Sequence, residues 1–152
     1  LSTVSSFPGD VRIIGNHSLV DLEDLASVSA VGGDLVIASN STMTSLTGLD
    51  SLVTIGGHLY VGRTHHRDEA GNPELVSLSA LRFVTTIGGD LYIRRNLRLG
   101  RLGMAALHTV GGDVTVLQNP NLPTACATEL VGQLSSYSGE TDVSENGTGA
   151  CH

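Results

Sequence analysis

The stretch TIGGDLYIRRNLRLGRL, residues 86–102, joins a Gly-Gly-Asp turn, a short apolar segment and an asparagine. Nearly the same phrase occurs as VGGDLVIASNSTMTSL at residues 31–46 and as VGGDVTVLQNPNL at residues 110–122. Aligned on the second residue of each turn, the phrase recurs at Gly9, Gly33, Gly57, Gly89, Gly112 and Gly139. A period of about 24 residues is typical of solenoids, in which each turn of the chain buries its apolar residues against its neighbours.

An asparagine stands seven positions after the turn in every repeat but one. In the third repeat Thr64 holds that place, the segment RTHHRDEAG intrudes, and the asparagine returns eight residues late. We therefore expect a structural ladder of Asn16, Asn40, Asn72, Asn96, Asn119 and Asn146. A side-chain amide both donates and accepts, so stacked copies can satisfy buried backbone groups. Asn16, Asn40 and Asn146 also begin Asn-x-Ser/Thr triplets, but as ladder members we expect them to be buried and not glycosylated.

Two apolar periods alternate within each repeat. Before the asparagine the period is two, as at Leu35 and Ile37, which predicts a strand. After it the period is three, as at Leu46, Leu49 and Leu52, which suits short extended or 3₁₀ segments around one axis. We predict a mainly β fold, a parallel solenoid of about six coils stacked at a strand spacing of about 4.8 Å.

The pattern GGDLxIxxNxxLxxLxxLxxVxxIGG resembles the receptor L-domain family, whose members are leucine-rich-repeat-like, right-handed β-helices. They occur in the insulin-receptor and epidermal-growth-factor-receptor ectodomains, and similar repeats occur in fungal cell-wall and bacterial surface proteins. The resemblance covers roughly residues 1–122 and implies a right-handed parallel β-helix. Because the chain has two Cys and lacks cysteine-rich companions, it looks closer to the bacterial surface-protein branch than to hormone receptors.

The opening LSTVSSFPGD matches LASVSAVGGD at residues 25–34, so the chain starts in the middle of a repeat. We expect one domain, residues 1–152, with repeat coils over 1–122, and we expect the natural protein to continue upstream. Residues 123–152 are predicted to form a cap. Its helix should begin with Thr124 as N-cap after Pro123 and cover the last coil with an apolar stripe of Leu130, Val131 and Leu134.

Cys126 on the predicted helix and Cys151 in the tail lie on either side of the cap. A disulfide between them would close a loop of about 26 residues and stabilise the fold by ~3 kcal/mol. This placement favours an oxidising compartment, although two Cys also suit a reduced cytosolic chain.

Composition excludes several classes of protein. Eight Arg and no Lys stand against fifteen Asp and Glu, giving a formal net charge of −7, which argues against a nucleic-acid partner. No apolar run approaches the roughly 20 residues that a transmembrane helix needs. The chain also lacks the Gly-x-Ser-x-Gly, phosphate-loop and dinucleotide motifs.

The outward strand positions form the candidate ligand-binding face, because Tyr and Arg on a rigid sheet are typical recognition anchors. The alternative is that Tyr and Val simply suit a half-exposed strand. The candidate residues are Arg12, Val36, Tyr60, Tyr92, Arg94, Thr115 and Leu117.

An acidic residue follows each turn, at Asp10, Asp34, Asp90, Asp113 and Glu140, with His58 in the remaining repeat. Such a column could bind Ca²⁺ or supply an acid/base pair, but we expect each carboxylate to accept hydrogen bonds from backbone amides of its own turn. In the insertion, His65, His66 and Arg67 are expected to form a solvated loop that decorates a binding surface, with no metal site.

We expect a non-catalytic extracellular or cell-surface module, without a cofactor, that binds a protein or a glycan through the exposed sheet face. A structural spacer within a larger envelope protein is the main alternative. A β-helical polysaccharide-acting enzyme would need a basic cluster beside its carboxylates, and ice binding would need a flat threonine array. The ligand and the oligomeric state stay open at this point.

Overall fold

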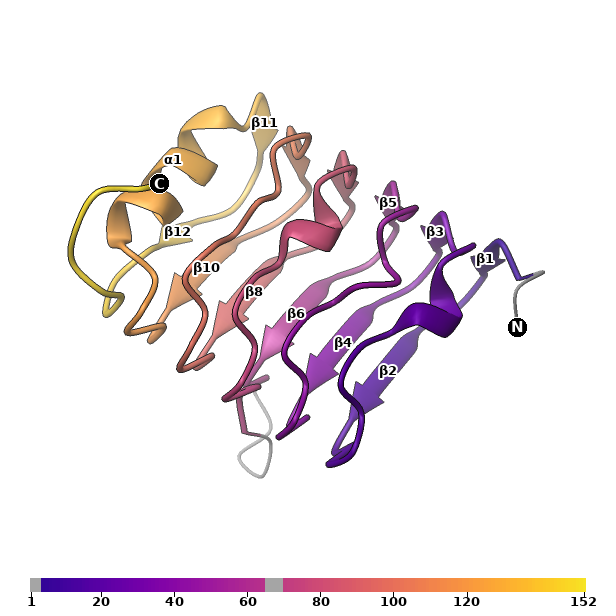
Figure 1. Cartoon of the computed structure of the whole chain (residues 1–152). Coiled ribbons are helices and arrows are strands. Elements are labelled where there is room, and N and C mark those ends of the chain that lie inside the picture. Colours follow the sequence, from indigo (N-terminus) through magenta and orange to yellow (C-terminus); the bar gives the residue numbers. More distant parts are fainter. Residues whose placement is uncertain (1–3, 65–69) are drawn as a thin grey trace.

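The computed structural model describes residues 4–64 and 70–152. Across these residues the strands form two parallel sheets of six strands each, which are not closed on one another. The smaller sheet contains β1 (Ser6–Phe7), β3 (Ala30–Val31), β5 (Thr54–Ile55), β7 (Thr86–Ile87), β9 (Thr109–Val110) and β11 (Ser136–Tyr137). The larger sheet contains β2 (Val11–Ile14), β4 (Leu35–Ala38), β6 (Leu59–Gly62), β8 (Leu91–Arg94), β10 (Val114–Leu117) and β12 (Thr141–Asp142). Each repeat thus contributes one strand to each sheet, and neighbouring repeats lie side by side (Figure 1).

Residues at equivalent positions of neighbouring repeats are paired in the larger sheet. Leu35 pairs with Leu59, and Leu59 pairs with Leu91. The eight-residue insertion does not shift this register, because Tyr60 of the third repeat still pairs with Tyr92 of the fourth. The alternation predicted for the strands therefore places the same repeat positions on the same face of the sheet.

The core lies between the larger sheet and the segments that follow each asparagine. Inward strand residues such as Ile37, Leu59 and Ile93 are fully buried, as are the period-three residues Leu46 and Leu78. Each fully buried aliphatic side chain of this size stabilises the fold by about 1.5–3 kcal/mol relative to exposure. Short 3₁₀ helices, η1 (Glu23–Leu25) and η2 (Ser79–Leu81), occur in these segments, in keeping with a period of three.

The glycine corners stack as closely as the backbone allows. A Cβ atom added to Gly56 would collide with the carbonyl oxygen of Gly32, and one added to Gly88 would collide with that of Gly56. The turn is therefore glycine-rich because the backbones of consecutive corners touch, which leaves no room for a side chain.

The asparagines form a column of hydrogen bonds beside the core. The backbone N–H and Nδ2 of Asn40 both donate to Oδ1 of Asn72, and those of Asn72 both donate to Oδ1 of Asn96. Asn72, which follows the insertion, occupies the place in the column, while Thr64 is buried outside it. Asn72 thus links three repeats, since its Nδ2 also donates to the carbonyl oxygen of Ile37.

Burial of the asparagines was expected for all three Asn-x-Ser/Thr triplets, and this prediction is wrong for Asn16. Asn40 is fully buried, Asn146 is half-buried and Asn16 is exposed. Asn16 still donates to Asn40 Oδ1 from its backbone N–H, but only the repeat that holds Asn40 packs against it.

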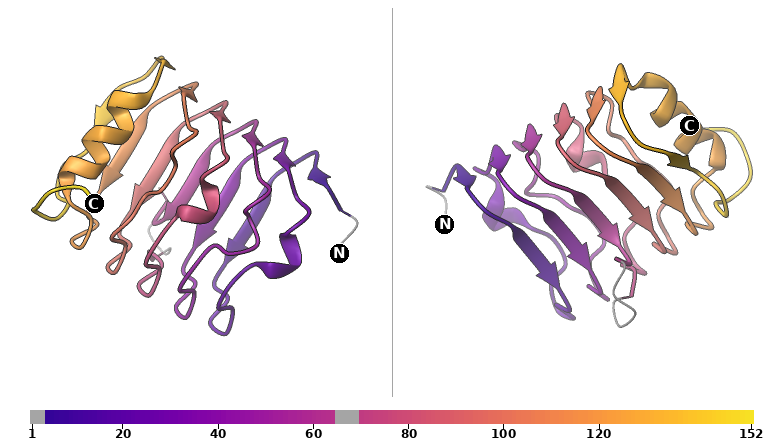
Figure 2. Two further views of the ribbon diagram at one scale, coloured as in Figure 1. Left: turned by 45° about the horizontal axis from the view of Figure 1, so that its top comes forward. Right: turned by 180° about the vertical axis from the view of Figure 1, so that it is seen from behind.

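A helix and a disulfide cover the C-terminal end, opposite the N-terminal repeat (Figure 2). Helix α1 (Thr124–Gln133) buries Cys126, Ala127 and Leu130 against the last repeat, and Val131 and Leu134 pack against the core as half-buried residues. The predicted Cys126–Cys151 disulfide is present.

The predicted N-cap of this helix is wrong. Pro123 holds the N-cap position, and Thr124 is the first helical residue. Thr124 instead donates its backbone N–H and its hydroxyl to the carbonyl oxygen of Gly147, which fastens the helix to the C-terminal tail.

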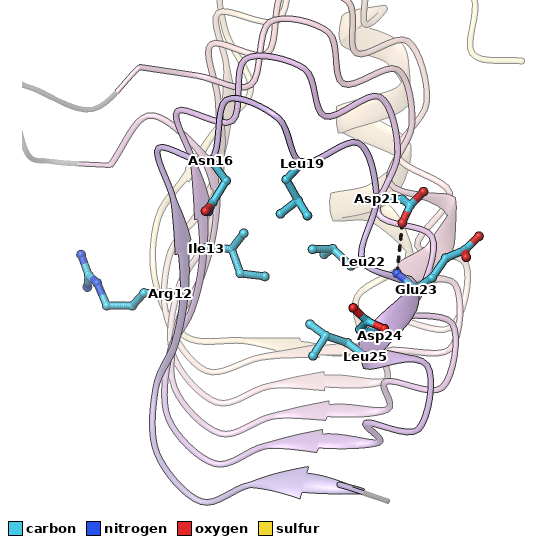
Figure 3. Close-up of a pocket in the computed structure, with 9 residues that line it drawn as sticks. All are labelled: Arg12, Ile13, Asn16, Leu19, Asp21, Leu22, Glu23, Asp24 and Leu25. Atoms are coloured by element: carbon cyan, nitrogen blue, oxygen red, sulfur yellow. Dashed lines mark hydrogen bonds between the residues drawn. The ribbon is translucent and has the colours of Figure 1, made fainter. Parts of the chain in front are cut away.

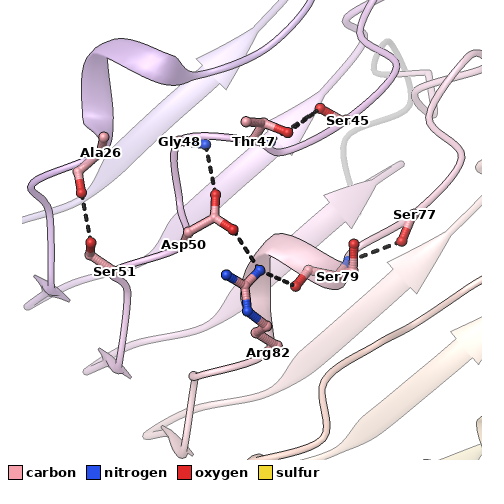
Figure 4. A network of polar contacts seen from close by, with 9 residues as sticks. All are labelled: Ala26, Ser45, Thr47, Gly48, Asp50, Ser51, Ser77, Ser79 and Arg82. Carbon is pink, nitrogen blue, oxygen red and sulfur yellow. Dashed lines mark hydrogen bonds and ion pairs between the residues drawn. The ribbon is translucent and has the colours of Figure 1, made fainter.

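On the side of the repeats opposite the larger sheet, polar contacts join consecutive repeats (Figure 4). Arg82 Nη1 donates to Asp50 Oδ1 at 2.6 Å, and the other carboxylate oxygen of Asp50 accepts from the backbone N–H of Gly48 at 3.1 Å. These contacts hold the pKa of Asp50 below its ordinary value: the Gly48 hydrogen bond contributes most and outweighs partial desolvation, and Arg82 adds to the effect.

Candidate recognition face

The outward face of the larger sheet carries the predicted ligand-binding residues, but their side chains differ in how far they are exposed to solvent. Arg12 is exposed, whereas Tyr60, Tyr92, Arg94 and Thr115 are half-buried.

Two of the predicted face residues are corrected by the structure. Val36 and Leu117 are buried, with 2% and 9% of their surface exposed. Val36 lies in register between Arg12 and Tyr60, whose larger side chains flank it, and Leu117 lies in register with Arg94. Neither aliphatic side chain therefore belongs to the accessible face.

The two tyrosines of the face form a stacked pair. Their ring centroids lie 5.0 Å apart with planes inclined by 3°. The separation is close to the spacing between neighbouring strands, so the rings stack along the direction in which repeats follow one another. One face of Tyr92 is thus covered by Tyr60, and its other face lies on the side of Thr115, its partner on β10.

Partial burial raises the pKa of both phenols above its ordinary value. For Tyr60 the second cause is the neighbouring Tyr92 phenol, followed by Asp90 and Asp34. For Tyr92 the carboxylates of Asp90 and Asp113 add to the effect of burial. Both hydroxyls therefore remain protonated at neutral pH and can donate as well as accept hydrogen bonds.

A small hollow adjoins the tyrosine pair, with a volume of about 30 Å³. It is lined by Tyr60, Arg63, Thr64, Tyr92, Arg94 and Thr115. Arg63 and Thr64 were not among the predicted face residues, because they stand six and seven positions after Gly57, beyond the outward strand positions three and five after each glycine. Arg63 is equivalent to Arg95 in the next repeat, and this recurrence of arginine at one repeat position is the signal in the sequence that points to it.

The acidic column at the start of the larger strands is occupied by backbone hydrogen bonds. Asp34 N–H donates to Asp10 Oδ1, and Asp113 N–H donates to Asp90 Oδ1, each at 2.8 Å. The expectation that each carboxylate serves its own turn is wrong, since the donor amide belongs to the following repeat. His58 takes part in the same way through Nδ1, which accepts from Asp90 N–H at 2.8 Å.

The insertion residues His65, His66 and Arg67 lie outside the described residues. Within residues 4–64 and 70–152, no three His, Cys, Asp or Glu side chains gather closely enough to hold a metal ion. Over the same ranges, no helix has the length and apolar character required to cross a membrane.

The N-terminal end of the stack carries a second, more open hollow of about 460 Å³ (Figure 3). Ile13, Leu19, Leu22 and Leu25 of the first repeat point into it, whereas Arg12 points away to the sheet face. Three acidic side chains, Asp21, Glu23 and Asp24, stand at its rim. This hollow is the end of the core itself, where equivalent residues of later repeats meet a neighbour on both sides.

No protein-family model, curated protein or solved structure matches this chain.

Proposed function

We propose that this chain is a non-catalytic extracellular recognition module that binds a protein or a glycan through the outward face of its larger sheet. The observation that carries this proposal is the stacked Tyr60–Tyr92 pair, half-exposed and adjacent to Arg63 and Arg94. Tyrosine and arginine are enriched among residues that dominate binding energy at interfaces. Their fixed register on paired strands lowers the entropy that ligand binding would otherwise cost.

For the fold, we propose a right-handed parallel β-helix of the receptor L-domain type, in its bacterial surface-protein branch. The repeat pattern of residues 1–122 supports this assignment, and the two parallel sheets and the C-terminal helix are compatible with it. The Cys126–Cys151 disulfide supports a location outside the cytosol, because disulfides persist in oxidising compartments.

A non-catalytic role is supported by the engagement of the acidic column. Asp10, Asp34, Asp90 and Asp113 each accept a hydrogen bond from a backbone amide of the next repeat. A structural role therefore accounts for these residues, and an acid/base pair or a Ca²⁺ site is not needed to explain them.

A structural spacer is the second candidate function. It is supported by the two columns of hydrogen bonds, one through the asparagines and one through the acidic residues and His58, which link neighbouring repeats from the first to the last. Such continuous linkage favours a stiff module whether or not it binds a ligand.

An array of defined polysaccharides and purified extracellular proteins separates the two candidates. The wild-type chain is compared with Tyr60→Ala/Tyr92→Ala and with Tyr137→Ala, which removes an exposed tyrosine from the other sheet. Recognition predicts a ligand whose affinity falls at least about tenfold in the double variant and is unchanged in the control. Absence of any ligand, or equal binding by all three proteins, would favour the spacer.

A further inference from the structure

The hollow beside the tyrosine pair has the size of one functional group. Its volume of about 30 Å³ exceeds the roughly 10–15 Å³ needed to hold one water molecule and is far below the roughly 300–1,000 Å³ of a pocket that encloses a ligand, so it admits a small polar group and not a whole sugar ring. A ligand that uses it must place one group in the hollow and lie with its remaining atoms across the sheet face.

Strand β6 ends, one residue before Arg63, at a position that only glycine can occupy. Gly62 is in register with Arg94 and has a positive φ of 101°. A Cβ at Gly62 would collide with the carbonyl oxygen of Arg94, so glycine is required there on both conformational and steric grounds.

Two guanidinium groups border the hollow. Arg94 Nε donates to Gln118 Oε1 at 3.3 Å, which holds the side chain in place. Within residues 4–64 and 70–152, no hydrogen bond or ion pair occupies the terminal nitrogens of Arg94 or the guanidinium of Arg63. These donors can therefore bind a planar anion in the bidentate manner that arginine favours.

Acidic groups of the same sheet are placed away from these donors or are already engaged. Asp90 precedes β8, four residues before Arg94, a span of about 13 Å along an extended strand. Asp142, which pairs with Thr115, influences Arg94 electrostatically, but its Oδ1 accepts hydrogen bonds from both the backbone N–H and the hydroxyl of Ser144. Although the chain carries a net charge of −7, the described residues at this end of the face thus leave the guanidinium of Arg63 and the terminal nitrogens of Arg94 without an ion pair.

From this arrangement we infer that the face binds an acidic sugar, with a uronic-acid carboxylate in the hollow between Arg63 and Arg94. The apolar C–H face of the sugar ring packs on the side of Tyr92 that Tyr60 leaves uncovered. Neighbouring sugars extend over the tyrosine hydroxyls. This inference rests on the proposed function and specifies its ligand: it requires a negative charge, which recognition by the tyrosines alone does not.

Calorimetric titration with a linear uronic-acid tetramer and with its carboxyl-reduced counterpart tests the inference. We expect the acidic tetramer to bind at least about tenfold more tightly than the reduced one, and Arg94→Gln or Arg63→Gln to remove that difference. The matched control is Arg98→Gln, which makes the same change in net charge at a residue paired with Glu74 outside the face. Urea unfolding of each variant verifies that the fold is retained.

The outcomes separate this inference from the proposed function. Equal affinity for the two tetramers, or an equal loss in Arg94→Gln and Arg98→Gln, overturns the acidic ligand and leaves tyrosine-dependent recognition standing. Failure of both tetramers to bind, while an array ligand binds in a Tyr60- and Tyr92-dependent way, overturns the acidic-sugar inference alone. If the tetramers and every array ligand fail, both proposals fall.

Discussion

The imidazole Nδ1 of His58 accepts a 2.8 Å hydrogen bond from the backbone N–H of Asp90. A carboxylate oxygen accepts the equivalent bond at the other junctions of this column, also at 2.8 Å. The same nitrogen lies 3.1 Å from Asp90 Oδ2, a contact that would need Nδ1 to donate. Because Nδ1 cannot accept and donate at once, the backbone bond requires the neutral ring with its proton on Nε2.

Replacement of His58 separates the role of acceptor from the identity of the side chain. His58→Asp installs the residue used by neighbouring repeats and should leave the free energy of unfolding within about 0.5 kcal/mol of wild type. His58→Ala removes the acceptor and should cost about 1 kcal/mol. Urea unfolding at neutral pH measures both. An equal loss in the two variants would mean that the acceptor is not what this position contributes.

Asn96 is the asparagine whose removal should be most damaging to the column. Its Oδ1 accepts from the backbone N–H and Nδ2 of Asn72, and its Nδ2 donates to the carbonyl oxygen of Val61. Asn96→Ala leaves these buried groups without partners and should lower the free energy of unfolding by about 2–4 kcal/mol. Asn121→Ala, at an exposed asparagine two residues after the next column member, is the control. Similar stability of the two variants would contradict a structural role for the column.

Features that follow from the period of the repeat could be predicted from the sequence. The column place of Asn72 is an example, because the apolar period resumes at Leu75 after the insertion. Strand positions and the disulfide are also evident from repeat spacing and from the location of the two Cys.

Features that depend on unlike neighbours could not be predicted in the same way. Val36 points outward as the period requires, yet it is buried because Arg12 and Tyr60 happen to flank it. The acidic residues serve the next repeat because the donor amide of the adjacent strand lies within reach, which the spacing along one chain does not reveal. The hydroxyl of Thr124 donates to the carbonyl oxygen of Gly147, which lies 23 residues further along the chain, so local sequence does not reveal this contact.

Asp50 should contribute to the stability of the fold in acid. Its pKa is lowered in the folded state, chiefly by the Gly48 hydrogen bond and further by Arg82. Its contribution is therefore present above the unfolded pKa, about 3.9, and is lost as the pH falls through the lower folded pKa. Asp50→Asn should reduce the loss of stability between about pH 5 and pH 2, whereas Glu129→Gln on the exposed side of α1 should not. Urea unfolding midpoints measured between about pH 5 and pH 2 test this prediction. If the midpoints of wild type and Asp50→Asn change identically with pH, Asp50 does not contribute to the acid dependence of stability.

The two ends of the stack differ in how the core terminates. At the C-terminal end Leu130 and the disulfide cover the last repeat. At the N-terminal end Ile13, Leu19 and Leu25 are only half-buried, and they face the 460 Å³ hollow. The backbone N–H of Asp10 is equivalent, in the first repeat, to the backbone N–H of Asp34, which donates to Asp10 Oδ1 of the repeat before it. Both the apolar side chains and the hydrogen-bond column at this end are thus shaped to receive one more repeat.

A seventh repeat added at this end should therefore stabilise the protein. A second copy of residues 25–48 placed directly before Leu1 preserves the period of 24, so its Leu35 equivalent falls in register with Val11 and its Asp34 equivalent can accept from Asp10 N–H. Stability in stacked repeats grows with each added interface, so the urea midpoint should rise and exchange of the Asp10 amide proton should slow. The control carries the same extension with its Leu35 equivalent changed to Asp, which places a charge in the interface. Equal midpoints for the two extended chains, together with wild-type exchange of the Asp10 amide proton, would show that the added repeat has not docked. Because every pairing residue is present in that repeat, matching register would then be insufficient for one repeat to pack on another.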